Sequence, residues 1–282
     1  MSTCNNKIRV GKPKWLRRTL PTGPEYENIR KLLKNHSLTT VCQEAQCPNQ
    51  FECYGEGTAT FMILGEKCTR NCGFCAVGHP PEFLPDPEEP LRVAEAVVLL
   101  KLRYAVVTSV TRDDLPDGGA ALFAETIREI RKQSPKTLIE VLIPDLQGNW
   151  YALKTIIDAG PDVLNHNVET VSRLYPEVRP QAIYGRSLEL LKKVKELQPK
   201  MVTKSGLMVG LGETMEELTD TWRDILTSGT DILTIGQYLQ PSANHLEVQR
   251  FIPPEEFEEY AVKATDDGFP GVASGAFVRS SY

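Results

Sequence analysis

Six of the seven cysteines of this 282-residue chain lie between residues 42 and 75, in two groups of three. The second group, Cys68-Thr-Arg-Asn-Cys72-Gly-Phe-Cys75, has the spacing C-x3-C-x2-C. An apolar run at 58–65 separates the groups, and its length predicts a buried strand. The second group would then lie in the loop at the C-terminal end of that strand. The first group has the spacing C-x4-C-x5-C and consists of Cys42, Cys47 and Cys53.

Three cysteines within eight residues can converge on one metal cluster. Four thiolates normally hold a [4Fe–4S] cluster, so three leave one iron open to bind a substrate. Disulfides and structural zinc are the alternatives. Disulfides are rare in the cytosol, where thiols stay reduced, and zinc needs four ligands in paired spacings, whereas neither group has a nearby fourth cysteine. The spacing therefore favours an iron–sulfur site.

Composition narrows the class of protein. The net charge is −5 and the sequence pI is near 5.6, which argues against a nucleic-acid partner held by a basic surface. No apolar run reaches the roughly 18 residues of a membrane-spanning helix, so we expect no membrane contact. The N-terminus shows neither an apolar signal region nor an Arg-rich presequence, which predicts a cytoplasmic protein. An organellar protein whose presequence has been removed would give the same sequence.

From residue 60 onward, apolar runs alternate with amphipathic stretches. Six strand–helix repeats predict an α/β protein with a parallel sheet and right-handed crossovers. Periodicity alone leaves open whether the sheet is open or a partial barrel, but in both the site lies at the C-terminal ends of the strands. We expect strands at 60–65, 104–110, 137–143, 163–168, 202–209 and 232–239, and helices near 90–102, 120–133, 150–158, 186–197 and 215–228.

Polar residues follow the fourth predicted strand. Alternation along a strand puts Asn165, Asn167 and Glu169 on the same side, which suggests an interior that holds a polar ligand. Any one of them could instead make a structural hydrogen bond, but the three together at one edge favour a ligand site. His166, on the opposite side, is expected to face the helices. Thr214-Met-Glu-Glu217 predicts a capping box at the start of the fifth helix.

The C-x3-C-x2-C loop, with Phe74 directly before its last cysteine, resembles the signature of radical S-adenosylmethionine (SAM) enzymes. In that superfamily the open iron of a [4Fe–4S] cluster is chelated by the methionine portion of SAM. One electron then cleaves the sulfonium and yields a 5′-deoxyadenosyl radical, which takes hydrogen from an unactivated carbon. The resemblance implies SAM and this cluster as cofactors, and as catalytic cluster ligands Cys68, Cys72 and Cys75.

The first cysteine group points to one family within this superfamily. Val41–Cys53, followed by Gly57–Gly65, is similar to lipoyl synthases, and the likeness runs from about residue 12 to the last residue. In that family these cysteines bind an auxiliary [4Fe–4S] cluster, whose fourth ligand is a serine of an Arg-Ser-Ser-Tyr motif. This chain ends in Arg279-Ser280-Ser281-Tyr282. The resemblance implies as auxiliary-cluster ligands Cys42, Cys47, Cys53 and Ser281, with Ser280 as the alternative to Ser281.

The resemblance also implies a fold and a set of SAM contacts. The fold would be a partial (β/α)6 TIM-like barrel at 58–245, with an N-terminal extension at 1–57 and a C-terminal extension at 246–282. Glu169 can accept hydrogen bonds from a ribose, and Arg179 or Arg186 could pair with the methionine carboxylate or with Glu residues. The whole predicted SAM site comprises Phe74, Thr108, Ser109, Asn165, Asn167, Glu169, Arg179, Arg186, Met208, Gln237 and Leu239.

The implied activity is that of a radical SAM sulfurtransferase. Two sulfur atoms from the auxiliary cluster would enter C6 and C8 of an octanoyl chain on a lysine of a lipoyl-carrier protein. The carrier would be the glycine cleavage H protein or a lipoyl domain of a 2-oxoacid dehydrogenase, and the reductant a ferredoxin or flavodoxin. The alternatives are a methylthiotransferase, for whose usual RNA-binding module this acidic chain has no room, and an electron-transfer protein, which would need four cysteines per cluster.

Overall fold

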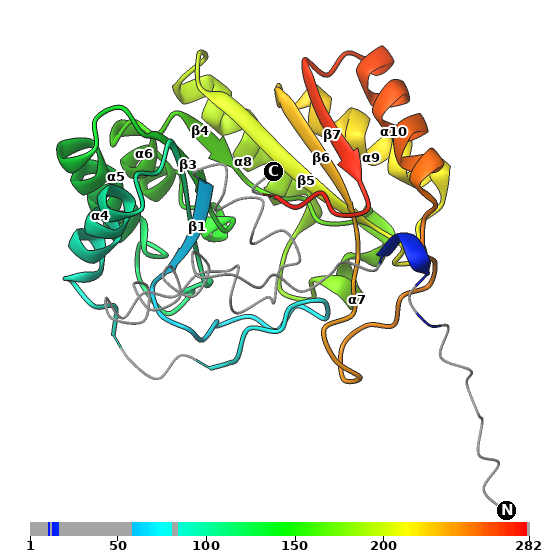
Figure 1. Cartoon of the computed structure of the whole chain (residues 1–282), viewed down its shortest axis with the longest axis horizontal. Helices are drawn as coiled ribbons and strands as arrows, with labels where there is room; N and C mark the ends of the chain where they lie inside the picture. The colour runs from blue at the N-terminus through cyan, green and yellow to red at the C-terminus, as the bar shows by residue number, and fades with distance from the viewer. Residues whose placement is uncertain (1–10, 12, 17–57, 81–83, 281–282) are drawn as a thin grey trace, which may run out of the picture.

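The computed structural model describes residues 11, 13–16, 58–80 and 84–280. Seven parallel strands form one sheet whose spatial order, β1 to β7, follows the sequence order. Figure 1 shows the sheet curved around an interior, with the helices packed outside it. The strands are β1 (Thr58–Ile63), β2 (Tyr104–Ser109), β3 (Leu138–Leu142), β4 (Val163–Asn165), β5 (Val202–Val209), β6 (Ile232–Gln237) and β7 (Gly271–Gly275).

A helix follows almost every strand, which confirms the expected partial barrel. The sequence did not predict the final pair, α10 and β7, which continues the same sheet beyond β6. Within the described residues, none of the helices has the length and hydropathy needed to cross a membrane. The helices are α4 (Glu89–Leu99), α5 (Ala120–Gln133), α6 (Trp150–Asp158), α7 (Tyr175–Val178), α8 (Tyr184–Leu197), α9 (Met215–Thr227) and α10 (Pro254–Asp267), with short 3-10 turns at Lys14–Leu16, Leu146–Gly148 and Ser172–Leu174.

Local sequence explains where the helices begin. In α9 the Thr214 side chain accepts a hydrogen bond from the Glu217 amide, and the Glu217 carboxylate accepts one from the Thr214 amide. This is the predicted capping box. Asn149 caps α6 by accepting from the Ala152 amide. These caps fix the starts of α6 and α9, the helices that follow β3 and β5.

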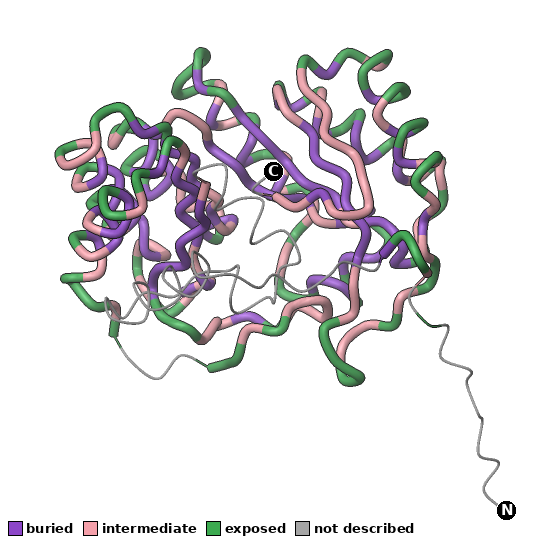
Figure 2. Tube along the Cα trace, viewed as in Figure 1, coloured by how far each residue is buried: buried purple, intermediate pink, exposed green. Residues whose placement is uncertain are grey.

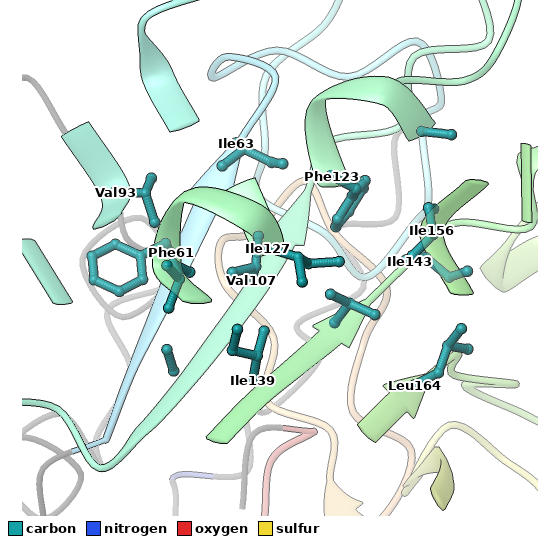
Figure 3. Packing of buried hydrophobic residues seen from close by; sticks show 14 of the residues in the cluster. Phe61, Ile63, Val93, Val107, Phe123, Ile127, Ile139, Ile143, Ile156 and Leu164 are labelled. Atoms are coloured by element: carbon teal, nitrogen blue, oxygen red, sulfur yellow. The ribbon is translucent and has the colours of Figure 1, made fainter. Parts of the chain in front are cut away.

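The core lies between the sheet and its outer helices. Phe61 and Ile63 of β1 pack with Val107 of β2, and the fully buried Phe123 and Ile127 of α5 cover them. Figure 3 shows these side chains filling the space between strands and helix. In Figure 2 the strands are mainly buried, while the outward faces of the helices are exposed. Burial of this apolar layer fixes the strands, and with them the positions of the loops at their C-terminal ends.

The inner side of the sheet carries polar side chains. In β3, Ile139 and Val141 belong to the apolar core, so alternation turns Glu140 toward the interior. Glu140 has no exposed surface, and Lys204 of β5 is 3% exposed. Their charges pair at 3.2 Å between Nζ and Oε2. A buried charge requires a partner, and β3 and β5 supply each other's partner inside the barrel.

Candidate cluster and S-adenosylmethionine site

The Cys68–Cys75 loop follows β1 and is held against the loop after β2. The Cys68 amide donates to the Gly78 carbonyl at 2.8 Å, and the Thr69 amide donates to the Thr111 carbonyl at 2.9 Å. The Cys68 sulfur accepts hydrogen bonds from the amides of Thr111, at 3.2 Å, and Arg70, at 3.4 Å. These donors would stabilise negative charge on the sulfur, as backbone amides do around iron–sulfur clusters.

Arg70 ties the same loop to two carboxylates. Its Nε and Nη2 donate to Asp113 at 2.7 and 2.9 Å, and Nη2 also donates to Asp145 at 2.6 Å. Arg70 is 6% exposed and Asp145 is fully buried. Burial alone would raise the pKa of Asp145, but the hydrogen bond and charge of Arg70 outweigh it and lower that pKa to about 2. Both groups are therefore charged at neutral pH, and the pair fixes the loop backbone between Cys68 and Cys72.

The loop after β6 holds the other end of the cysteine loop. The Leu246 amide donates to the Gly73 carbonyl at 3.0 Å, and His245 Nε2 lies 3.0 Å from the Cys75 carbonyl oxygen. A side chain at Gly73 would place its Cβ 2.9 Å from Leu246 Cγ. The close approach of the two loops therefore requires glycine at position 73.

The three cysteines of this loop fit a cluster better than a single ion. All three are free and partly buried, and they lie within eight residues of one loop. No three His, Cys, Asp or Glu side chains of the described residues converge on one ion, whereas thiolates around a cluster bind separate irons. Burial raises the pKa of Cys75 to about 11. A bound cationic group would release that proton, as metals do at thiol sites.

The end of β4 brings three predicted residues together. Asn165 and Asn167 are buried, and Asn167 Nδ2 donates to Glu169 Oε1 at 3.0 Å. Glu169 has φ +71°, and hydrogen bonds from its amide to Gly206 and from Met208 to its carbonyl hold this conformation. Such strain in a non-glycine residue is frequent at ligand sites. Among the described residues, neither Asn165 Oδ1 nor Asn167 Oδ1 has a partner, which leaves two buried acceptors for a ligand.

Arg179 lies beside this group. Its Nη1 donates to the carbonyls of Asn167 and Val168 at 2.9 and 3.2 Å, and its buried Nε has no partner among the described residues. Burial raises the pKa of Glu169, and Arg179 opposes that shift. The Val178 carbonyl, directly before Arg179, accepts a hydrogen bond from the Gly73 amide of the cysteine loop at 3.0 Å. The end of β4 and the cysteine loop therefore face one another.

The other predicted contacts divide between free and occupied groups. Ser109 Oγ is buried without a partner among the described residues, whereas Thr108 donates to the Leu142 carbonyl. Gln237 is occupied by four backbone hydrogen bonds. Arg186 lies over Asp145, 3.4 Å away, and is partly exposed. The remaining three are partly buried, with Phe74 and Met208 against one apolar cluster and Leu239 in the loop after β6.

The C-terminal segment returns across the inner side of the sheet. Ser280 Oγ accepts a hydrogen bond from Asn167 Nδ2 at 2.6 Å, and its carbonyl accepts one from Asn165 Nδ2 at 3.1 Å. In Figure 1 the chain after β7 turns back into the arc of strands. Ser280 therefore lies at the predicted SAM site. Outside the described residues are the other expected auxiliary-cluster ligands, Cys42, Cys47, Cys53 and Ser281.

His166 does face the helices, as predicted. Its Nδ1 contacts the Ile143 carbonyl at 2.8 Å and its Nε2 contacts Ser187 of α8 at 3.0 Å. Arg70 with its two carboxylates and the Glu140–Lys204 pair were not among the residues predicted from the sequence. A charged residue inside the apolar run Leu-Ile-Glu-Val-Leu was a usable signal for Glu140, because such a residue needs a partner on a neighbouring strand.

Comparison with known proteins agrees with this geometry. The family model of the radical SAM superfamily matches residues 62–225, more than half of the chain. The model of the N-terminal domain of lipoyl synthase matches residues 2–47. Among solved structures, SuiB of Streptococcus suis with bound S-adenosylmethionine has a TM-score of 0.62 at 12% identity, over 91% of this chain and 57% of that one. Methylornithine synthase has a TM-score of 0.51 at 14% identity, over 90% of this chain and 79% of its own chain.

The fold and the three-cysteine loop thus define a radical SAM enzyme. The lipoyl synthase of Desulfotalea psychrophila is 67% identical over 99% of this chain and 93% of its own length. That of Rubrobacter xylanophilus is 57% identical, over 97% and 85%. This chain belongs to the lipoyl synthase family, whose members use SAM and [4Fe–4S] clusters.

Proposed function

We propose that this chain inserts two sulfur atoms, at C6 and C8, into an octanoyl group carried on a lysine of a lipoyl-carrier protein. One observation supports this most directly. Ser280 and the cysteine loop reach the same ends of the strands, because Asn167 donates to Ser280, Arg179 donates to the Asn167 carbonyl, and the neighbouring Val178 carbonyl accepts from the Gly73 amide of the cysteine loop. A chain that used SAM cleavage alone would have no need for the motif there.

Each part of the chain has a proposed task. Residues 58–245 form the barrel, in which Cys68, Cys72 and Cys75 would hold the SAM-binding cluster. The N-terminal 57 residues would supply Cys42, Cys47 and Cys53 to the auxiliary cluster, and residues 246–282 its serine ligand. When bound, the two clusters and SAM supply the electron, the carbon-centred radical and the sulfur.

The protein's own residues would bind SAM and orient it. The unpartnered oxygens of Asn165 and Asn167 and the carboxylate of Glu169 are acceptors suited to the ribose hydroxyls. Arg179, through its free Nε, is better placed than Arg186 for the methionine carboxylate, since Arg186 already lies over Asp145. Phe74 and Met208, on one apolar cluster, would exclude water from the adenine side.

The partners follow from the chemistry. We propose an octanoylated H protein or lipoyl domain as the substrate carrier, and a one-electron donor such as ferredoxin or flavodoxin. We propose the cytoplasm as its location, because thiols stay reduced there and remain able to hold clusters.

The serine ligand gives the sharpest test of the auxiliary site. Three variants, Ser280→Ala, Ser281→Ala and the double substitution, would be reconstituted without oxygen, and iron and lipoyl product measured. The double variant should keep SAM cleavage but lose product formation and part of the iron, and one single variant should reproduce that loss. Unchanged iron and product in the double variant would refute the proposed tail ligand.

A further inference from the structure

A buried polar network crosses the barrel interior beneath the SAM site. Glu140 of β3 has no exposed surface and makes three interactions. Its Oε1 accepts from Asn165 Nδ2 at 2.8 Å, its Oε2 accepts from Tyr104 at 2.7 Å, and Lys204 Nζ lies 3.2 and 3.3 Å from its two oxygens. Of the four residues in this network, only Asn165 has a role in the chemistry described above, as a proposed SAM contact.

The network ends on the C-terminal segment. Asn165 Nδ2 donates both to Glu140 and to the Ser280 carbonyl. Since both partners are acceptors, the amide nitrogen and not its oxygen must face them. The carboxylate of Glu140 therefore sets the orientation of the Asn165 side chain, and with it the donor offered to the tail.

Strand β6 is shaped to receive the same segment. A side chain at Gly236 would put its Cβ 2.3 Å from the Val278 carbonyl oxygen. Only glycine allows the chain to pass this close. The Val278 amide in turn donates to the Gly275 carbonyl at 3.0 Å. Contacts to β4 and β6 thus hold the tail on both sides of β5.

A buried ion pair is a poor source of stability, because desolvation offsets its attraction. An apolar pair of similar volume would stabilise the barrel at least as well, so the position of Glu140 calls for another explanation. Fixing a single hydrogen-bonded arrangement is such an explanation. Here the arrangement that the pair fixes is the one that holds Ser280.

We propose that Asn165, oriented by the Glu140–Lys204 pair, is a positioning residue for the C-terminal serine motif. It acts through Ser280 and holds the tail inside the barrel, so that the motif reaches the auxiliary cluster. This inference rests on the proposed function for its purpose, but the docking of the tail can be measured without any cluster chemistry.

The test compares amide hydrogen exchange of residues 276–282 in the anaerobically reconstituted full chain. Asn165→Leu removes the donor to Ser280. A second pair of variants separates hydrogen bonding from charge. Glu140→Gln with Lys204→Met keeps an acceptor for Asn165, whereas Glu140→Leu with Lys204→Met removes it, and both are neutral. Thr60→Val, at a buried threonine of β1 at the opposite edge of the sheet from β7, is the control.

Loss of the hydrogen bond in Asn165→Leu and in the Leu/Met variant should speed tail exchange about fivefold. Amide exchange in α10 should stay unchanged. A general loss of structure would speed exchange in α10 as well. The Gln/Met variant and Thr60→Val should stay within about twofold of the wild type. Wild-type tail exchange in Asn165→Leu would overturn the proposal, as would equal exchange in the two double variants.

Iron content and SAM cleavage of the Glu140→Leu, Lys204→Met variant, which replaces no proposed SAM contact, separate the two claims. Fast tail exchange together with iron reduced toward one cluster, and with deoxyadenosine still formed, supports both the docking role and its purpose. Fast exchange with full iron content would overturn the link to the auxiliary cluster while leaving SAM cleavage intact. Absence of lipoyl product from the wild type would count against the proposed function alone.

Discussion

The side chain of Asn167 donates a 2.6 Å hydrogen bond to the hydroxyl of Ser280, which lies 113 residues later in the chain. The same amide nitrogen donates to Glu169 at 3.0 Å. One side chain thus touches both the proposed ribose-binding carboxylate and the C-terminal serine motif. The proposed SAM site therefore adjoins Ser280, and substitutions in either should be assayed for both SAM cleavage and sulfur insertion.

The first prediction concerns the cluster loop. Cys68→Ala should reduce deoxyadenosine formation to background. The variant leaves only two thiolates, which are too few to hold the cluster that binds SAM. Liquid chromatography with mass spectrometry measures the product. Cys4→Ala, a change of the cysteine outside both groups, should leave the rate unchanged. Continued SAM cleavage by Cys68→Ala would contradict the assignment of this loop.

The second prediction separates the two clusters. Cys47→Ala should still cleave SAM, because the Cys68–Cys75 loop is intact, but it should make no lipoyl product. Deoxyadenosine and product are measured in one reaction with an octanoyl-lysine peptide. Lipoyl product from this variant would show that the first cysteine group is not the sulfur source.

The third prediction concerns Arg70. A lysine cannot bond Asp113 and Asp145 together in the forked geometry of a guanidinium, so Arg70→Lys should loosen the cysteine loop. We expect the cluster to lose iron to a chelator about tenfold faster, which corresponds to about 1.4 kcal/mol. Arg128→Lys, on the exposed face of α5 where Arg128 pairs with Glu125, is the matched control. Equal rates of iron loss would show that Arg70 does not hold the loop.

The fourth prediction concerns pH and stability. Burial, assisted by the charge of Arg179, lowers the pKa of His166 to about 4. As the pH falls, the His166 imidazole is protonated near pH 6.5 in the unfolded chain but only near pH 4 in the folded chain. The free energy of unfolding should therefore fall by about 2 kcal/mol from this group between pH 7.5 and 5.

Urea unfolding at the two pH values, for the wild type and His166→Asn, measures that loss. The variant has no titrating group at this position, so its stability at pH 7.5 should be lower but should change less with pH. A wild type and variant that lose the same free energy would show that His166 does not titrate as its surroundings indicate.

The repeating strands and helices of the fold were predictable because each buries a clear apolar pattern. The predicted helix at 150–158 matches α6 to the residue, and the strand at 202–209 matches β5. β7 was missed because Gly271-Val-Ala-Ser-Gly275 is short, has glycine or alanine at three of its five positions, and is only partly buried. Its pairing with β6, a tertiary contact, makes it a strand.

The candidate site was predictable where residues adjoin in sequence and not where they come from distant elements. The cysteine spacing indicated the cluster loop, and the polar pattern after the fourth strand indicated Asn167 and Glu169, although β4 ends at Asn165 and not at 168 as expected. Arg70 and Asp145, however, meet across 75 residues, and no local pattern relates them. The predicted role of Gln237 as a SAM contact remains a prediction, although its amide is occupied by backbone groups.

The origin of the inserted sulfur tests the central claim most directly. The chain would be reconstituted with ³⁴S-sulfide, freed of excess sulfide, and incubated with SAM, a reductant and an octanoyl-lysine peptide for a single turnover. Mass spectrometry of the peptide should show two ³⁴S atoms in the dihydrolipoyl product, since both sulfurs come from the chain's own auxiliary cluster. Product that carries unlabelled sulfur, or a peptide that stays octanoylated while SAM is cleaved, would contradict the account.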